Sequence, residues 1–252
     1  MLRTRVIPVL LLRNKGLVKT IKFNSGKYIG DPINALKIFN DKEVDEIVVL
    51  DIDASKEGRK PNFKAVKEFA SECFMPLGYG GGIQELDDVK NLFALGVEKV
   101  VINTAAIQNL NLISQSAKIF GDQSIVLSID VKKNLLGRHQ VYSHKSGKAV
   151  SLDLIKYVND AISAGAGEIL LQSVDQDGLM TGYDLRIIQK ISSNVNVPIV
   201  ACGGAGRIDD LRKGSDAGAS ALAAGSMFVY HGPHKAVLIN YPTQSQLKLI
   251  LY

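Results

Sequence analysis

The chain has 252 residues, of which 46% are hydrophobic and 22% are charged. This composition is typical of an ordinary folded protein and excludes a wholly disordered or fibrous chain. The 30 basic and 25 acidic residues give a net charge of +5, but the basic residues are scattered along the chain, so we expect an anionic small ligand and no nucleic-acid partner.

Three further features narrow the class of protein. The chain has no uninterrupted apolar run of ~18 residues, so we expect no spanning helix and no membrane partner. Its first residues lead into a short apolar run without a small-residue cleavage site, which argues against a signal peptide. The two cysteines, Cys73 and Cys202, make no disulfide framework and no metal-ligand spacing. We therefore expect a cytoplasmic protein without a metal or another cofactor.

Short apolar runs rich in β-branched residues alternate with amphipathic stretches, which predicts strands alternating with helices. In chain order the expected strands are 6–12, 47–52, 75–79, 100–103, 124–130, 169–173, 198–202 and 221–224. The expected helices are 32–42, 62–72, 86–95, 111–120, 152–164, 184–194 and 208–217. Eight strands and at least seven helices in 252 residues predict an α/β fold, a single (β/α)8 TIM barrel.

An internal repeat relates the two halves of the chain. Gly81-Gly82, followed by an Asp-Asp pair and a later glycine, recurs in the same order from Gly203-Gly204, 122 positions further along. A period near half the chain length predicts one domain over residues 1–252, built from half-barrels at about 1–122 and 123–252. A doubly wound open sheet is the alternative, but it gives no reason for such a repeat.

Glycine pairs follow the third and seventh expected strands, and a helix follows each pair. Glycines let backbone N–H groups approach an anion closely, and the start of a helix adds attraction. The residues after the fourth and eighth strands complete each cradle. We therefore predict two phosphate sites for a phosphorylated small-molecule substrate, formed by Gly81, Gly82, Asn103 and Thr104 and by Gly203, Gly204, Gly225 and Ser226. The alternative is that these glycines only form tight turns.

Carboxylates at the ends of strands are the candidate acid and base groups. Asp130 closes the fifth expected strand, Asp51 ends the second, and Asp177 follows the sixth. We predict a catalytic role for all three residues. The alternative is that such aspartates cap the loop or helix that follows.

Taken together, these residues resemble the cyclase subunit of imidazole glycerol phosphate synthase, a barrel that uses ammonia from a partner glutaminase. The resemblance runs from Arg5 to Phe228. Its landmarks are Gly30-Asp31-Pro32, Leu50-Asp51-Ile52, Gly80-Gly81-Gly82-Ile83, Ile102-Asn103-Thr104-Ala105, Ser128-Ile129-Asp130, Asp175-Gln176-Asp177-Gly178, Gly182-Tyr183-Asp184 and Gly203-Gly204-Ala205-Gly206. It implies a heterodimer with a glutaminase subunit.

The resemblance fails at one catalytic position. The family uses an aspartate at the end of the fifth strand, which matches Asp130, and another at the end of the first strand, where this chain has Leu11. Leucine cannot exchange a proton, and losing one member of an acid/base pair commonly costs ~10²–10⁴-fold in rate. A working cyclase would need Asp51 or Asp177 as a substitute. Gln172 is a further departure, where the family tends to carry threonine.

Other family features are present. The family gates an ammonia channel with a ring of charged residues, and the matching positions are Arg5, Glu46, Lys99 and Glu168. Two cations and two anions neutralise one another, as buried charges require. Lys19 matches a lysine in the mobile first loop of the family, which closes over the substrate, so we place it with the phosphate-binding residues.

The retained channel and cradles, without the first aspartate, resemble a paralogous branch of the family. Its members work with a dedicated glutaminase and an ATP-dependent sugar amidotransferase to place acetamidino groups on bacterial surface sugars. The opening segment, residues 3–12, is similar to that branch. The leading prediction is an ammonia-handling subunit of such a glutamine amidotransferase system. A functional histidine-pathway cyclase, which is a lyase, and a catalytically silent glutaminase-binding scaffold are the alternatives.

Overall fold

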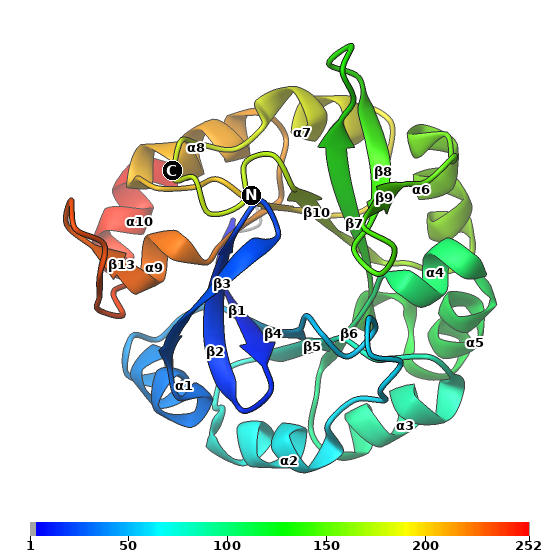
Figure 1. The fold of residues 1–252 in the computed structure, drawn as a ribbon, viewed down its shortest axis with the longest axis horizontal. Coiled ribbons are helices and arrows are strands. Elements are labelled where there is room, and N and C mark those ends of the chain that lie inside the picture. Colours follow the sequence, from blue (N-terminus) through cyan, green and yellow to red (C-terminus); the bar gives the residue numbers. More distant parts are fainter. Residues whose placement is uncertain (1–3, 252) are drawn as a thin grey trace.

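The computed structural model describes residues 4–251, so residues 1–3 and 252, at the two ends of the expected domain, lie outside it. Within residues 4–251, eight parallel strands close into a barrel in which the sixth strand pairs with the fifth, as Figure 1 shows. These strands are β1 (Arg5–Arg13), β4 (Ile47–Asp51), β5 (Leu77–Gly80), β6 (Lys99–Ile102), β7 (Ile125–Lys133), β10 (Glu168–Ser173), β11 (Ile199–Cys202) and β12 (Ala221–Ala224). The predicted (β/α)8 barrel is confirmed.

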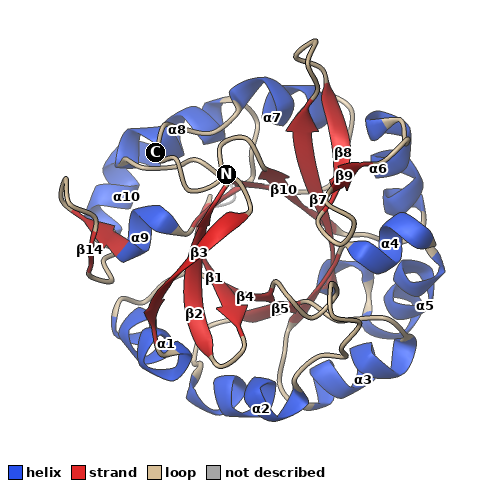
Figure 2. Ribbon diagram, viewed as in Figure 1, coloured by secondary structure: helices blue, strands red, loops and turns tan. Residues whose placement is uncertain are grey.

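Helices surround the barrel and separate its strands (Figure 2). The outer ring consists of α1 (Pro32–Asp41), α2 (Phe63–Glu72), α3 (Leu86–Ala94), α5 (Asn111–Phe120), α6 (Leu154–Ser163), α7 (Leu185–Ser192), α8 (Ile208–Asp216) and α10 (Gln244–Leu251). Side chains of Asp31, Asn62 and Asp153 accept backbone N–H groups at the starts of α1, α2 and α6, which explains where these helices begin. Among the described residues, no helix has the length and apolar character needed to cross a membrane.

The buried apolar side chains form two cores. The larger one lies between the sheet and the outer helices and includes Leu36, Leu92 and Ile188. The smaller one fills the inside of the barrel and contains Ile7, Val9, Val48, Val101, Val126, Leu170, Val200, Cys202, Ala221 and Ala223. Because each strand is buried on both faces, its sequence is continuously apolar, and this pattern made the strands predictable.

Elements outside the basic repeat were not expected. The first loop forms an antiparallel hairpin, β2 (Gly16–Ile21) with β3 (Asn24–Gly30), and the stretch after β7 forms β8 (His139–Ser143) and β9 (Lys148–Ala149). Two short helices, α4 (Thr104–Gln108) and α9 (Ser226–Val229), follow the fourth and eighth barrel strands, and η1 (Asp122–Ser124) precedes β7. The pair β13 (Tyr230–His231) and β14 (Ala236–Val237) precedes the last helix.

The half-chain repeat is visible in hydrogen bonds as well as in sequence. Asp88 Oδ2 accepts the backbone N–H groups of Gln84 and Glu85 at 3.0 and 3.1 Å. Its counterpart Asp210 makes the same pair of bonds, each of 3.0 Å, before α8. The two aspartates therefore fix the same turn in each half, directly after the glycine clusters.

Candidate functional site

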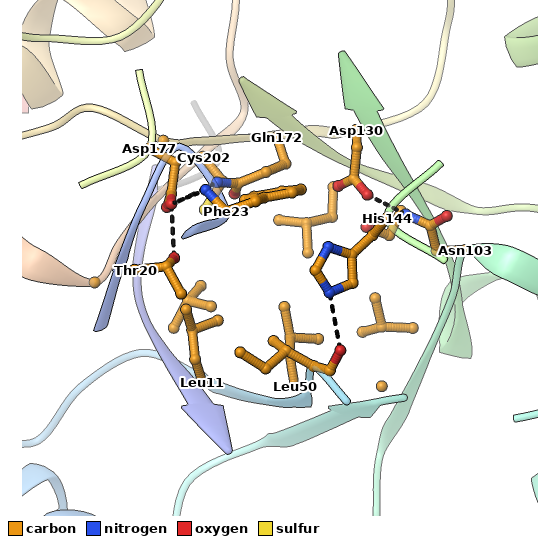
Figure 3. Close-up of a pocket in the computed structure, with 18 of the residues that line it drawn as sticks. Leu11, Thr20, Phe23, Leu50, Asn103, Asp130, His144, Gln172, Asp177 and Cys202 are labelled. Carbon is orange, nitrogen blue, oxygen red and sulfur yellow. Dashed lines mark hydrogen bonds between the residues drawn. The ribbon is translucent and has the colours of Figure 1, made fainter. Parts of the chain in front are cut away.

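One pocket opens at the carboxyl ends of the barrel strands, as Figure 3 shows. All nine residues predicted to bind phosphate line it, as do all three predicted catalytic aspartates. The phosphate candidates are Lys19, Gly81, Gly82, Asn103, Thr104, Gly203, Gly204, Gly225 and Ser226. The barrel thus gathers side chains from both halves of the sequence around one cavity.

The two cradles have matching backbone geometry. Gly81 and Gly203 have φ angles of +109° and +93°, which side chains rarely allow, and a Cβ on either would lie within 3 Å of a backbone oxygen. Each cradle also borders a helix start, since α4 begins at Thr104 and α9 begins at Ser226. Backbone N–H groups in a first helical turn have no intrahelical partner, so such starts attract anions.

Asp130 lies in β7, three residues before this strand ends, and its buried side chain lines the pocket. Its Oδ2 accepts a hydrogen bond of 2.9 Å from Asn103 Nδ2. Burial raises the pKa of Asp130 to about 7, against the opposing effect of this bond. A carboxyl group with such a pKa can both take up and release a proton near neutral pH, which suits general acid/base chemistry.

Asp177 holds the first hairpin over the pocket. Its Oδ2 accepts hydrogen bonds from Thr20 Oγ1 at 2.7 Å and from the backbone N–H of Phe23 at 3.1 Å, and its backbone oxygen accepts from Lys22 at 3.0 Å. Burial raises the pKa of Asp177, whereas these bonds act to lower it. The carboxylate is thus a pocket group and also the attachment point of the hairpin.

The carboxylate of Asp51 is occupied by hydrogen bonds and an ion pair with residues of the loop that follows it. Its Oδ1 accepts the backbone N–H groups of Asp53 and Ala54, and its Oδ2 pairs with Arg59 at 3.2 Å. These contacts fix the turn after β4, which is the capping role considered as the alternative. Asp51 nevertheless lines the pocket, so its catalytic role stays a prediction.

Lys19 projects from β2 into the pocket rather than into solvent. Its Nζ donates a hydrogen bond of 2.7 Å to the backbone oxygen of Val9, and a Cβ at position 225 would lie 2.2 Å from that Nζ. Gly225 therefore makes room for the lysine. Burial lowers the pKa of Lys19 to about 8, and the Asp177 carboxylate opposes this shift. The amine of Lys19 therefore lies beside the second cradle, and its lowered pKa brings its loss of a proton close to neutral pH.

Leu11 lies on the opposite side of the mouth from Asp130 in Figure 3. It pairs with Leu50 across β1 and β4, and both leucines line the pocket. In the same view, the carboxylates of Asp130 and Asp177 lie on the side away from these leucines, with Gln172 between them. Leu11 and Leu50 therefore form an apolar stretch of the pocket wall opposite Asp130 and Asp177.

The roof of the pocket contains a histidine, His144, which directly follows β8. His144 Nε2 lies 2.9 Å from the backbone oxygen of Ile52, and the ring meets Phe23 edge-on at 5.3 Å. Because a carbonyl can only accept, Nε2 carries the proton. Burial, with help from Lys56, lowers the pKa of His144, so the ring is neutral at pH 7. No motif marks this residue, because it enters the site through an unpredicted hairpin.

At the opposite end of the barrel, the four predicted ring residues meet. Arg5 hydrogen-bonds to both Glu46 and Glu168, and Lys99 Nζ lies 2.9 Å from Glu46 Oε2 and 2.7 Å from Glu168 Oε2. Both glutamates are buried, while Arg5 and Lys99 retain partial exposure. Each cation bridges both anions, so the charges alternate around a closed ring.

Between this charged ring and the pocket, the inside of the barrel is apolar. Side chains of Ile7, Val48, Val126 and Ala221 belong to the inner core, and Val9, Val101 and Leu170 form the floor of the pocket. These inner-core side chains carry no charge.

No group of three or more His, Cys, Asp or Glu side chains within residues 4–251 is arranged to hold a metal ion. Cys202 lines the pocket, but burial raises the pKa of its thiol to about 12. It is therefore a packed thiol rather than a nucleophile.

These features define a (β/α)8 barrel protein with a ligand pocket at the carboxyl ends of its strands and a charged ring at the other end. The chain belongs to the family described as "Histidine biosynthesis protein", whose model matches residues 5–235. It is 51% identical to a Pseudomonas aeruginosa protein that is provisionally named imidazole glycerol phosphate synthase subunit hisF2. That match covers 98% of this chain and 99% of the relative. This chain is 40% identical over 98% of its length to 97% of the imidazole glycerol phosphate synthase subunit HisF of Exiguobacterium sibiricum. The chain is therefore a HisF-like subunit.

Proposed function

We propose that this subunit receives ammonia from a partner glutaminase at the charged ring and delivers it through the barrel to the pocket. The observation that carries the proposal is the closed ring of Arg5, Glu46, Lys99 and Glu168 beneath an apolar interior. Ammonia is small and uncharged in the form that reacts, so an apolar path admits it and disfavours ammonium and other ions.

The acceptor at the mouth is a phosphorylated small molecule. Two glycine cradles lie on one pocket, each with a helix start beside it, and Lys19 adds a cation close to the second cradle. Two anion sites on one cavity favour a ligand with a phosphate group at each end. The absence of a carboxylate at Leu11 indicates that this acceptor differs from the substrate of the family's cyclase.

The pathway that fits best is the amidination of surface sugars, in which this subunit works with an ATP-dependent sugar amidotransferase. Leu11 weakens cyclase chemistry without affecting the ring or the cradles.

An isotope competition tests ammonia delivery. The protein is combined with a partner glutaminase and an ATP-dependent sugar amidotransferase, and supplied with glutamine labelled with ¹⁵N at the amide in an excess of unlabelled ammonium. Delivery through the barrel predicts a product enriched in ¹⁵N above the bulk ammonium. A product with the isotope ratio of the bulk would overturn the proposal. Glutamine hydrolysis in a complex that transfers no ¹⁵N would favour the scaffold.

A second candidate is a working histidine-pathway cyclase. The observation that favours it is the pair Asp130 and Asp177, two buried carboxyl groups with raised pKa values in one pocket. Such a pair could share the acid and base roles without an aspartate at position 11. Growth of a histidine-requiring strain that lacks its own cyclase, at the wild-type rate and with this gene alone, would support this candidate and count against the first.

A further inference from the structure

One segment carries the whole net charge of the chain. Residues 131–152, here called the basic arm, contain Lys132, Lys133, Arg138, Lys145 and Lys148 and no aspartate or glutamate. Their charge of +5 equals the difference between 30 basic and 25 acidic residues in the complete chain. The remaining residues therefore carry no net charge.

The tip of the basic arm exposes two consecutive leucines. Leu135 and Leu136, in the turn between β7 and β8, are 106% and 79% exposed, and Leu135 has the highest exposure among the large hydrophobic residues that the structure describes. In Figure 1 the hairpin extends beyond the ring of helices. Adjacent, fully exposed leucines on a projecting turn are unfavourable in water and mark a contact site.

The arm presents these leucines on a fixed turn. Asn134 Oδ1 accepts the backbone N–H groups of Leu136 and Arg138, each at 3.0 Å. Lys133 and His139, on opposite strands of the hairpin, both contact Asp184 Oδ2, at 2.6 and 2.9 Å. The turn and its stem are thus held by side chains.

Cations remain available around the tip. Lys133 is used by Asp184, but Lys132 and Arg138 are exposed, and neither forms a salt bridge with another described residue. Lys132 instead lies 5.3 Å from the centre of the Tyr142 ring. Lys145 and Lys148 are also exposed, but they lie at the far end of β8 from the tip. The surface around the leucines therefore combines apolar side chains with unneutralised positive charge.

We propose that the tip of the basic arm binds an anionic lipid surface, with Leu135 and Leu136 inserted among the lipids and the neighbouring cations against their headgroups. The tip is convex, and its two side chains supply far less than the ~800 Å² per partner of a standard protein interface. A lipid surface needs no matching cavity, and it attracts both the apolar side chains and the basic ones. Such peripheral binding requires no spanning helix, but it departs from the expectation, drawn from the sequence, of no membrane partner. It goes beyond the proposed function and does not depend on it.

The test is sedimentation of the full chain with vesicles. Vesicles of phosphatidylcholine mixed with phosphatidylglycerol are compared with vesicles of phosphatidylcholine alone, at low and at high salt. We expect binding to the mixed vesicles, weakened by salt. The double variant L135S/L136S should lower the partition coefficient more than about tenfold, and R138Q should lower it about fivefold.

Leu249→Ser is the matched control, because Leu249 is 85% exposed on α10, away from the arm. It should bind as the unmodified chain does. Absence of vesicle binding, or equal binding by L135S/L136S, would overturn the proposal. Self-association that the leucine substitutions abolish, without vesicle binding, would assign the tip to a contact between protein chains and would also overturn it.

Discussion

Asn103, which directly follows β6, donates a hydrogen bond of 2.9 Å to Asp130 in β7, so a residue of the first cradle also influences the pKa of a candidate acid. The bond favours the carboxylate over the protonated acid. Replacing Asn103 by leucine, which has a similar shape but no donor, should raise the pKa of Asp130 above its present value of about 7. A ¹³C NMR titration of the Asp130 carboxyl measures this directly, and an unchanged midpoint would show that the bond has little effect.

Asp130 should also make stability depend on pH. Its pKa is about 7 in the folded chain, against ~3.9 in an unfolded one. The folded state therefore holds the proton more tightly. Its contribution to stability is complete below pH ~4 and is lost as the pH rises to about 7, with an upper limit of about 4 kcal/mol. Urea unfolding should show a steeper loss of stability between pH 4 and pH 8 for the unmodified chain than for D130N, and parallel curves would contradict this assignment.

The barrel was predictable because its signals are local and repeated. Continuous apolar runs such as residues 169–173 belong to strands buried on both faces, and the repeated glycine pairs fixed the order of the two halves. Parallel strands bring their carboxyl ends to one rim of the barrel. Motifs at strand ends therefore predicted that Asp130, Asn103 and Gly203 lie close together, and all three line the pocket.

Pocket residues that depend on irregular hairpins were not predictable. His144 enters the roof because β8 folds back across the mouth to Ile52, a contact between residues 92 positions apart. Phe23 lies at the tip of a hairpin with positive φ angles at Lys22, Phe23 and Ser25, and no apolar periodicity marks it. Polar loops carry weak propensity signals, so tertiary contacts decide their shape.

The attachment of the first hairpin is open to a direct test. Asp177→Ala removes the acceptor for Thr20 and for the Phe23 backbone, so the hairpin should open more often. Trypsin cleavage after Lys22 or Lys27 should become faster, by about fivefold for each ~1 kcal/mol of lost hydrogen bonding. Asn24→Ala is the control, since it removes only an exposed local bond to Lys22. Cleavage at equal rates in both variants would contradict the role of Asp177.

The charged ring should contribute strongly to stability because its glutamates are buried. Lys99→Met leaves Glu46 and Glu168 with Arg5 as their only described cationic partner, and breaking a buried network commonly costs about 3–5 kcal/mol. Partial exposure of Lys99 places the expected loss at the lower end of that range. Lys90→Met breaks an exposed pair with Asp87 and should cost less than about 1 kcal/mol. Urea unfolding curves compare the two variants, and equal losses would show that solvent screens the ring.

Leu11 allows a direct test of whether the pocket still supports the reaction of the cyclase family. Leu11→Asp places a carboxyl group on the apolar wall of the pocket, facing Asp130, and creates the acid/base pair that the cyclase family uses. If the cradles still fit that family's substrate, ammonia-dependent cyclase activity should rise by ~10²–10⁴-fold and allow growth of a histidine-requiring strain without its own cyclase. Leu50→Asp, which adds a carboxyl group on the neighbouring strand, is the control and should give no growth.

If the unmodified gene supports growth as well as the L11D gene does, the leucine has never limited the reaction. Growth with neither gene, in chains that fold and bind the glutaminase, would show that the pocket now takes a different acceptor.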